Sequence, residues 1–400
     1  MNILLWFIIL TVLLAFVYHH WVYPVVLKKL AKGKLVQLSQ QHLPKNLPKI
    51  SILVPVYNEA QHLLNKVTNL AALDYPRDKL SIHFGLDGCT DNSAKRIKDA
   101  MTLAEQNGLN CQLHEFKANK GKIQVMNKLI SKLKHQADIL VMTDASALIS
   151  IDALKVSVIN LQNQNIAVVS GKYLLAEEGN QNEQAYWTMQ NDIRINESKL
   201  GSSIGVPGAF FAIRNELASE LSSNVINDDF VMPMMAVIKG YRAIIDDRIQ
   251  IVEMQPDSTD CELKRRMRLG AGNLQQLFIC KALINFSTTG LCFFSSKFLR
   301  GALPLGLFSC GISLMYLAVA GSVVALALTL VILAAIVSGF CAEKLNKRIP
   351  LCTMAYYAFS QYVASFVGQI FYFLGRYDKS WSGSVNKLKS NVTSNREYSR

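Results

Sequence analysis

Long apolar runs occupy both ends of the chain, whereas apolar and polar positions alternate in its middle. Residues 3–26 and residues 303–340 contain no Asp, Glu, Lys or Arg. About 20 apolar residues cross a bilayer core of roughly 30 Å as one helix. The first run therefore predicts one membrane-spanning helix. The second run is too long for a single crossing and predicts two helices joined by a turn at Gly321 and Ser322.

The charges beside these runs predict an orientation. Residues 28–34 contain four lysines directly after the first run, so the N-terminus is expected outside and the next domain in the cytoplasm. The first run has no basic segment before it and no cleavage signal after it, which predicts a retained anchor. Residues 351–374 are a last, aromatic-rich candidate span. This scheme places the basic tail outside, against the same charge rule, and a re-entrant third segment would remove the conflict.

Between the apolar runs, the periodicity predicts alternating strands and helices. Residues 50–56 predict a strand, and the spacing of Leu63, Val67 and Leu70 predicts a helix after it, with Asn58 as its cap. This order predicts an α/β fold with a mostly parallel sheet, in which ligands bind at the carboxyl ends of the strands. The other predicted elements are strands at 82–86, 113–116 and 137–142, a helix beginning at 91–93 and a helix at 122–133.

Charge and composition narrow the class of protein. The chain has 400 residues, with 42 Lys and Arg against 29 Asp and Glu, which gives a formal net charge of +13. Its mean hydropathy is +0.20, and the apolar excess lies at the two ends, which excludes a simple cytosolic enzyme. Basic residues cluster beside the apolar runs, so anionic membrane lipid explains much of the charge. The eight cysteines form no Cys-x-x-Cys pair, which argues against a zinc site or a disulfide framework.

Candidate functional residues follow the predicted strands. Tyr57 and Glu59 come just after the first strand, and Asp87 directly follows the second. Each of them also fits an ordinary turn or helix cap. Lys122 follows Gly121, which permits close backbone approach, and a Lys there suits a diphosphate. A Lys on a solvated helix face is the alternative.

Three more clusters combine charge with a helix or strand end. Asp144 follows an apolar strand, where a carboxylate can bind a hard cation or simply cap a loop. Asp228 and Asp229 open a helix, where one acid could deprotonate an alcohol or only interact with the helix dipole. Arg265 and Arg268 belong to a dense basic cluster that could bind a departing phosphate or lipid headgroups.

The order and spacing of these motifs are more specific than any single motif. The segments are Pro55-Val56-Tyr57-Asn58-Glu59, Leu86-Asp87-Gly88-Cys89-Thr90-Asp91, Gly121-Lys122 with Asn127, Thr143-Asp144-Ala145-Ser146, Gly208-Ala209, Asp228-Asp229 and Arg265-Arg266-Met267-Arg268. Together they resemble membrane-bound family 2 glycosyltransferases over about residues 48–375. The resemblance implies an inverting hexosyltransferase with a GT-A nucleotide-sugar-binding domain and membrane helices at both ends.

The resemblance also implies a role for each position. Asp229 matches the general base, and Asp228 stands where the family often has Glu. Asp144 matches the first Asp of the family's D-x-D motif, which binds Mg²⁺ or Mn²⁺ and the donor diphosphate. The other implied donor contacts are Pro55, Tyr57, Glu59, Asp87, Lys122, Ser146, Arg265 and Arg268, and the implied acceptor contacts are Gly208 and Ala209.

Three positions depart from the family pattern. Ser146 replaces the second Asp of D-x-D, so metal binding would depend on Asp144 and the donor phosphates. Leu269 replaces a Trp that accompanies processive polymer synthesis in the family. Ser296 stands where relatives often carry His.

The sequence therefore predicts a multi-pass enzyme of a bacterial-type inner membrane, with a cytoplasmic catalytic domain, a UDP-sugar donor and a lipid-linked or polysaccharide acceptor. Single-sugar transfer and polymer synthesis both stay open, and export or synthase proteins are candidate partners. A non-catalytic membrane scaffold or transporter subunit is the alternative. Nucleic acid is not expected, because no basic patch is interleaved with aromatic residues. The expected divisions are an anchor at 1–27, a linker at 28–47, the transferase domain at 48–285, an interfacial segment at 286–302, about three membrane helices at 303–375 and a basic tail at 376–400.

Overall fold

The computed structural model describes residues 2–35, 42–106, 108–176, 181–254, 259–344 and 350–375. These residues fall into two compact units. The α/β unit holds Leu27–Asp257 and Ile279–Cys292, and the helical unit holds Met1–Val26, Ser258–Phe278 and Phe293–Tyr377. The basic tail predicted at 376–400 and part of the predicted linker lie outside the described residues.

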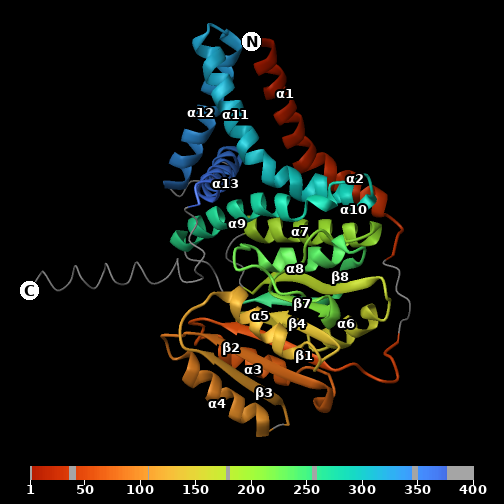
Figure 1. The fold of residues 1–400 in the computed structure, drawn as a ribbon. Helices are drawn as coiled ribbons and strands as arrows, with labels where there is room; N and C mark the ends of the chain where they lie inside the picture. The colour runs from red at the N-terminus through yellow and green to blue at the C-terminus, as the bar shows by residue number, and fades with distance from the viewer. Residues whose placement is uncertain are drawn as a thin grey trace, which may run out of the picture. The chain divides into compact units, whose positions relative to one another are not determined.

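An eight-stranded sheet forms the centre of the α/β unit (Figure 1). Its strand order is β3-β2-β1-β4-β7-β6-β8-β5. The run β3-β2-β1-β4 is parallel, whereas β7 pairs antiparallel with both β4 and β6. The predicted α/β fold with a mostly parallel sheet is confirmed. The strands are β1 (Ile50–Val56), β2 (Leu80–Asp87), β3 (Asn110–Phe116), β4 (Ile139–Thr143), β5 (Ala147–Ile149), β6 (Ile166–Leu175), β7 (Phe210–Arg214) and β8 (Arg242–Glu253).

Strand β1 lies at the centre of the parallel run and is buried at every position. A parallel strand with both faces covered is a continuous apolar run, which is why its bounds could be predicted from sequence. The helix predicted at 122–133 also forms with those bounds. The helices of the unit are α3 (Leu63–Ala71), α4 (Ser93–Gln106), α5 (Lys122–Leu133), α6 (Ala153–Leu161), α7 (Gln181–Leu200) and α8 (Asp228–Ile238).

The turn after β1 differs from the predicted helix cap. Helix α3 begins only at Leu63, and Asn58 has a φ of 55°, in the left-handed region. The Asn58 Oδ1 accepts a hydrogen bond from the backbone N–H of Thr90 at 2.9 Å. Asn58 therefore joins the loops that follow β1 and β2, because a short amide side chain tolerates this backbone conformation. Its predicted role as the cap of α3 is wrong.

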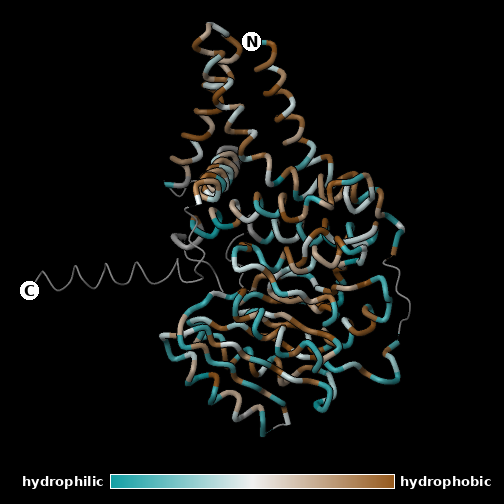
Figure 2. Tube along the Cα trace, viewed as in Figure 1, coloured by the Kyte–Doolittle hydropathy of each residue, from teal (hydrophilic) through white to brown (hydrophobic). Residues whose placement is uncertain are grey.

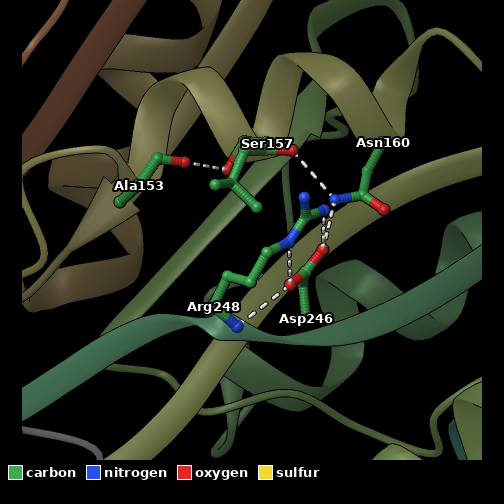
Figure 3. A network of polar contacts seen from close by, with 6 residues as sticks. Ala153, Ser157, Asn160, Asp246 and Arg248 are labelled. Carbon is green, nitrogen blue, oxygen red and sulfur yellow. Dashed lines mark hydrogen bonds and ion pairs between the residues drawn. The ribbon is translucent and has the colours of Figure 1, made fainter. Parts of the chain in front are cut away.

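A polar network ties α6 to β8 (Figure 3). The Arg248 guanidinium donates to both carboxylate oxygens of Asp246, at 3.0 and 2.7 Å. Asn160 on α6 donates from Nδ2 to Asp246 Oδ2 at 2.8 Å. On the same helix, the Ser157 hydroxyl donates to the Ala153 carbonyl at 2.7 Å. The Asp246 carboxylate is thus satisfied by bonds that fix the helix against the strand.

The helical unit contains the apolar runs from both ends of the sequence, seen as brown segments in Figure 2. Among the described residues, three helical stretches are long and apolar enough to cross a membrane: Asn2–Ala31, Thr288–Val319 and Val323–Ala342. Gly321, with a φ of 88°, separates the last two, as predicted. The helices of this unit are α1 (Asn2–Val17), α9 (Thr259–Ile279), α11 (Leu299–Val319), α12 (Val323–Lys344) and α13 (Pro350–Phe373), with π-helical turns at Tyr18–Val22 and Phe294–Phe298. Helix α2 (Tyr23–Ala31) continues from this unit into the α/β unit, and α10 (Thr288–Phe293) lies almost entirely in the α/β unit.

The predicted division into an interfacial segment at 286–302 and membrane helices at 303–375 stays a prediction. The structure has one continuous helical stretch from Thr288 to Val319 across the predicted boundary. Helix α13 has 24 residues but is less apolar than the three candidate spans. A crossing by α13, or a re-entrant path, stays a prediction.

Helix α9 crosses α13 at two glycines. A Cβ added to Gly270 on α9 would lie 2.5 Å from the Cα of Ser365 on α13. A Cβ added to Gly368 on α13 would overlap the carbonyl oxygen of Met267 on α9. The two backbones are therefore in direct contact at this crossing, which only residues without a side chain allow.

Candidate active site

One pocket in the α/β unit brings together four of the eight predicted charged residues: Lys122, Asp144, Asp228 and Asp229. It lies where β1 and β4 end and where α5 and α8 begin, which is the carboxyl edge expected for ligands in a parallel sheet. Its lining residues are Pro55, Lys122, Met126, Met142, Thr143, Asp144, Gly208, Phe211, Asp228, Asp229 and Met232. Six of these were predicted as site residues, and the apolar floor of Met and Phe side chains was not.

Lys122 is the cation at the centre of this pocket. Its Nζ lies 2.8 Å from Asp144 Oδ1 and 3.8 Å from Asp228 Oδ2. Burial lowers the pKa of the Lys122 ammonium, but Asp144, Asp228 and Asp229 raise it by more, so the net shift is upward. Lys122 is therefore held in its charged form, and three carboxylates surround a single positive charge.

Asp229 is placed by the start of α8 and by Gly208. The Asp229 Oδ1 accepts a hydrogen bond from the Phe230 N–H at 3.0 Å, at the positive end of the helix dipole. A Cβ added to Gly208 would lie 2.5 Å from Asp229 Oδ2. The backbone of Gly208 therefore supports the carboxylate directly, and any side chain at that position would displace it.

The turn that carries Asp144 is bonded to the segment before β7. The Asp144 N–H donates to the Ala209 carbonyl at 3.2 Å, and the Thr143 hydroxyl donates to the same oxygen at 2.8 Å. Ala209 is buried and does not line the pocket, so the structure shows it as a backbone support. Ser146 is also buried, with 8% of its surface exposed. The acceptor contact predicted for Ala209 and the donor contact predicted for Ser146 stay predictions.

Glu59 lies within the electrostatic reach of the same acids. Burial, together with the nearby charges of Asp144, Glu253 and Asp91, raises the pKa of its carboxyl group to about 7, with Lys122 acting in the opposite direction. The pKa of a carboxyl group near neutrality is typical of functional sites. Glu59 and the half-buried Tyr57 are not among the lining residues of the pocket, so their predicted nucleoside contacts stay predictions.

The side chain of Asp87 has a structural role in this chain. It is completely buried, and its two carboxylate oxygens accept hydrogen bonds from the N–H groups of Lys120, at 2.7 Å, and Gly121, at 2.8 Å. Gly121 has a φ of 89°, which suits Gly. Asp87 thereby shapes the loop that delivers Lys122 to the pocket. The predicted contact of Asp87 with a nucleoside stays a prediction.

Arg265 and Arg268 lie on α9, in the helical unit. Arg266, between them, stacks over the ring of Tyr357 on α13, at 5.0 Å from the ring centroid. This contact is typical of a cation–π pair and fixes the face that α9 turns towards α13. The roles predicted for Arg265 and Arg268 at the diphosphate stay predictions.

The donor groups of the pocket fit a divalent cation only in part. Within the described residues, no group of three His, Cys, Asp or Glu side chains could hold a metal ion by itself. Asp144 and Asp228 nevertheless flank one ammonium, which shows that a cation is stable between these carboxylates. Hard carboxylate oxygens suit Mg²⁺ or Mn²⁺, which are commonly held by one or two carboxylates together with substrate phosphates. The site therefore fits a metal ion that arrives with a diphosphate.

The sheet and its pocket define the class of protein. The chain is similar in structure to the mannosyltransferase PcManGT from Pyrobaculum calidifontis, which was solved in complex with GDP-Man and Mn²⁺. The TM-score is 0.71 at 23% identity, and the match covers 92% of this chain and 99% of that chain. The α/β unit thus has the fold of the GT-A glycosyltransferases.

The sequence comparisons match one domain of the chain to a family. Residues 51–222 match Glycosyl transferase family 2. The probable glycosyltransferase YdaM of Bacillus subtilis (strain 168) is 24% identical over 257 residues, which cover 60% of this chain and 59% of YdaM. Residues 51–222 therefore form a family 2 glycosyltransferase domain, as the motifs predicted.

Proposed function

We propose that this chain is a membrane-bound, inverting glycosyltransferase that moves a sugar from a nucleotide donor to an acceptor hydroxyl. The observation that carries the proposal is the pocket itself, where Asp144, Asp228 and Asp229 surround Lys122 at the edge of a GT-A-type sheet. The three candidate membrane spans favour an acceptor that is lipid-linked or part of an envelope or extracellular glycan.

The chemistry follows from the charges that the reaction creates. Breaking a glycosyl–phosphate bond releases a nucleoside diphosphate, and its new negative charge must be stabilised. Lys122 supplies a permanent positive charge for this purpose. A bound Mg²⁺ or Mn²⁺, held by Asp144, would add Lewis-acid stabilisation of the phosphates. The relative PcManGT, with GDP-Man and Mn²⁺, supports a nucleotide sugar and a metal ion as ligands.

Asp229 acts as the general base in this proposal. It removes the proton of the acceptor hydroxyl while that oxygen attacks the anomeric carbon from the side opposite the diphosphate. A single displacement inverts the anomeric configuration, so an α-linked donor gives a β-linked product. Gly208 keeps the Asp229 carboxylate in one position.

A donor panel tests the proposal. The purified protein, in nanodiscs, receives UDP-sugars and GDP-mannose in turn, each with Mg²⁺, with Mn²⁺ or with EDTA, and free nucleoside diphosphate is measured. We expect one donor to give metal-dependent release, and a UDP-sugar is the expected donor. No release from any donor, with membrane lipid extract as acceptor source, would contradict the proposal and favour a non-catalytic scaffold. Electrophoresis of the product then separates single-sugar transfer from polymer synthesis.

A further inference from the structure

A lysine is buried beneath the pocket where the sequence pattern predicts an apolar side chain. Lys66 lies on α3, on the same face as Leu63, Val67 and Leu70, and its exposed fraction is 0%. Lysine is almost never fully buried unless it is paired, because an ammonium loses its hydration in the interior. The burial of a lysine at position 66 therefore needs a specific explanation.

The Lys66 ammonium bonds to both sides of the turn that carries Asp144. Its Nζ donates to the Thr143 hydroxyl oxygen at 2.7 Å and to the Ala147 carbonyl oxygen at 2.6 Å. Thr143 ends β4, and Ala147 begins β5. The residues between them are 144–146, the segment that matches the D-x-D motif. Lys66 thus fixes both ends of this segment at once.

The same network reaches the acceptor side of the pocket. The Thr143 hydroxyl accepts from Lys66 and donates to the Ala209 carbonyl at 2.8 Å. Ala209 follows Gly208, whose backbone supports the Asp229 carboxylate. One ammonium is therefore connected, through two hydrogen bonds, to the segments that position Asp144 and Asp229.

A second clamp on the same helix shows that a charge is not needed for support alone. Asn69 holds β5 by donating to the Ile149 carbonyl at 2.8 Å and accepting from the Ile149 N–H at 3.0 Å. A neutral amide fixes the backbone there at a lower desolvation cost than a charged group. The charge at Lys66 needs an additional explanation.

The surrounding charges give that explanation. Burial lowers the pKa of the Lys66 ammonium by more than Asp144 and Glu253 raise it, and the resulting pKa is about 7. Near neutral pH the ammonium therefore exists partly in its neutral form when the pocket holds no anion. A diphosphate beside Asp144 would add negative charge and favour the ammonium form.

We propose that Lys66 is a positioning residue for the donor, whose buried ammonium orders the Asp144 turn and adds positive charge behind the diphosphate. The inference rests on the function proposed above, because it requires a nucleoside diphosphate to bind at Asp144. Donor binding then takes up a proton at Lys66. Since the binding-competent form is the protonated one, affinity is highest below the pKa of about 7 and falls as the pH rises.

The test compares Lys66→Met with Asn69→Ala, which removes the neutral clamp on the same helix. Binding of UDP and GDP with Mg²⁺ is measured by calorimetry between about pH 7 and 9, where the second phosphate ionisation, near pH 6, is complete. We expect Lys66→Met to bind about tenfold more weakly at pH 7, and to lose less affinity with rising pH than the wild type, in which both Lys66 and Glu59 titrate near pH 7. Asn69→Ala should lower the melting temperature but keep the pH dependence of the wild type.

A third variant, Thr143→Val, keeps the ammonium and removes the hydroxyl that links it to Ala209. We expect it to weaken binding while keeping the pH dependence, because the ammonium remains. If Lys66→Met does not fold, Lys66→Gln, which is polar but uncharged, replaces it with the same expected loss of binding and of pH dependence. Unchanged binding and pH dependence in Lys66→Met, or the same loss of binding and of pH dependence in Asn69→Ala, would overturn the inference. A wild-type protein that binds no nucleotide would instead contradict the proposed function.

Discussion

Two acid–base pairs in the α/β unit differ in how completely their charges are matched. Arg248 and Asp246 form a two-point ion pair, to which Asn160 adds a third bond, and Asp246 is only 9% exposed. Lys122 instead forms ion pairs with both Asp144 and Asp228, and the side chain of Asp144 is 34% exposed. The charges of Asp246 and Arg248 balance each other, whereas the acids around Lys122 carry more negative charge than this one cation balances.

The difference separates a structural pair from a functional one. An ion pair whose charges are balanced, between a helix and a strand, contributes to stability and leaves no charge for a ligand to neutralise. A group of carboxylates around one ammonium, at the carboxyl edge of a parallel sheet, lowers its electrostatic energy by taking up a further cation or a proton. Substitutions in the two places should therefore affect different quantities.

The largest effect is expected at Asp229. Asp229→Asn removes the general base and should lower transfer by roughly 10²–10⁴-fold. Its binding of nucleoside diphosphate should change little, because the amide keeps the shape of the side chain. Asp152→Asn, at an acid before α6 that does not line the pocket, is the control. Wild-type turnover of Asp229→Asn would refute the base assignment.

Lys122→Met should have the next largest effect. It leaves Asp144 and Asp228 without their shared cation, so the donor KM should rise by about 10–100-fold, with a smaller fall in kcat. Steady-state kinetics at saturating metal measures both constants. Lys128→Met changes an exposed lysine of the same helix and should behave as wild type. An equal loss in the two variants would show that Lys122 acts only through helix stability.

Gly208→Ala sharpens the comparison without changing charge. The added methyl group would meet Asp229 Oδ2 at 2.5 Å and must displace the carboxylate. A shift of about 1 Å at a reacting group can cost up to about 10²-fold in rate, so kcat should fall by about 10–100-fold. Gly311→Ala has open space around the new methyl group and should leave kcat unchanged. Full activity of Gly208→Ala would mean that Asp229 need not stay in its observed position.

The smallest effect on activity is expected at the matched pair. Asp246→Asn should lower the free energy of unfolding by about 2 kcal/mol and leave kcat unchanged. Burial raises the pKa of Asp246, but the hydrogen bonds from Arg248 and Asn160 lower it by more, so the net shift of the pKa is downward. Its stabilisation is therefore present above the ordinary carboxyl pKa of about 3.9 and is lost as the pH falls through the lower, folded-state pKa. Urea unfolding of both proteins as a function of pH measures this difference.

The sequence alone predicted the bounds of those strands and helices whose apolar and polar positions follow a regular pattern throughout. Strand β1 and helix α5 formed with the predicted bounds, because continuous burial and a regular apolar stripe specify them locally. The cap at Asn58 failed because its side chain bonds to Thr90, in a loop far along the chain. Such a contact depends on how two loops meet, which no local pattern records.

The candidate site divides in the same way. Asp144, Asp228 and Asp229 were predicted from the order and spacing of several motifs together, and the structure brings all three into one pocket. Lys66 gave a signal, a charge within an apolar stripe, but its partners Thr143 and Ala147 come from another part of the chain. The hydrogen bonds of Asp87 could not be predicted from the sequence either, because they come from backbone N–H groups, which nearly every residue type has.

The glycine contacts between α9 and α13 have a mechanical consequence. Because the two backbones touch at Gly270 and Gly368, the helices cannot slide or separate without losing that contact. Any tilt of α13 is therefore passed to α9 and to the guanidinium groups that it carries. The positions of Arg265 and Arg268 are thus mechanically coupled to the position of α13.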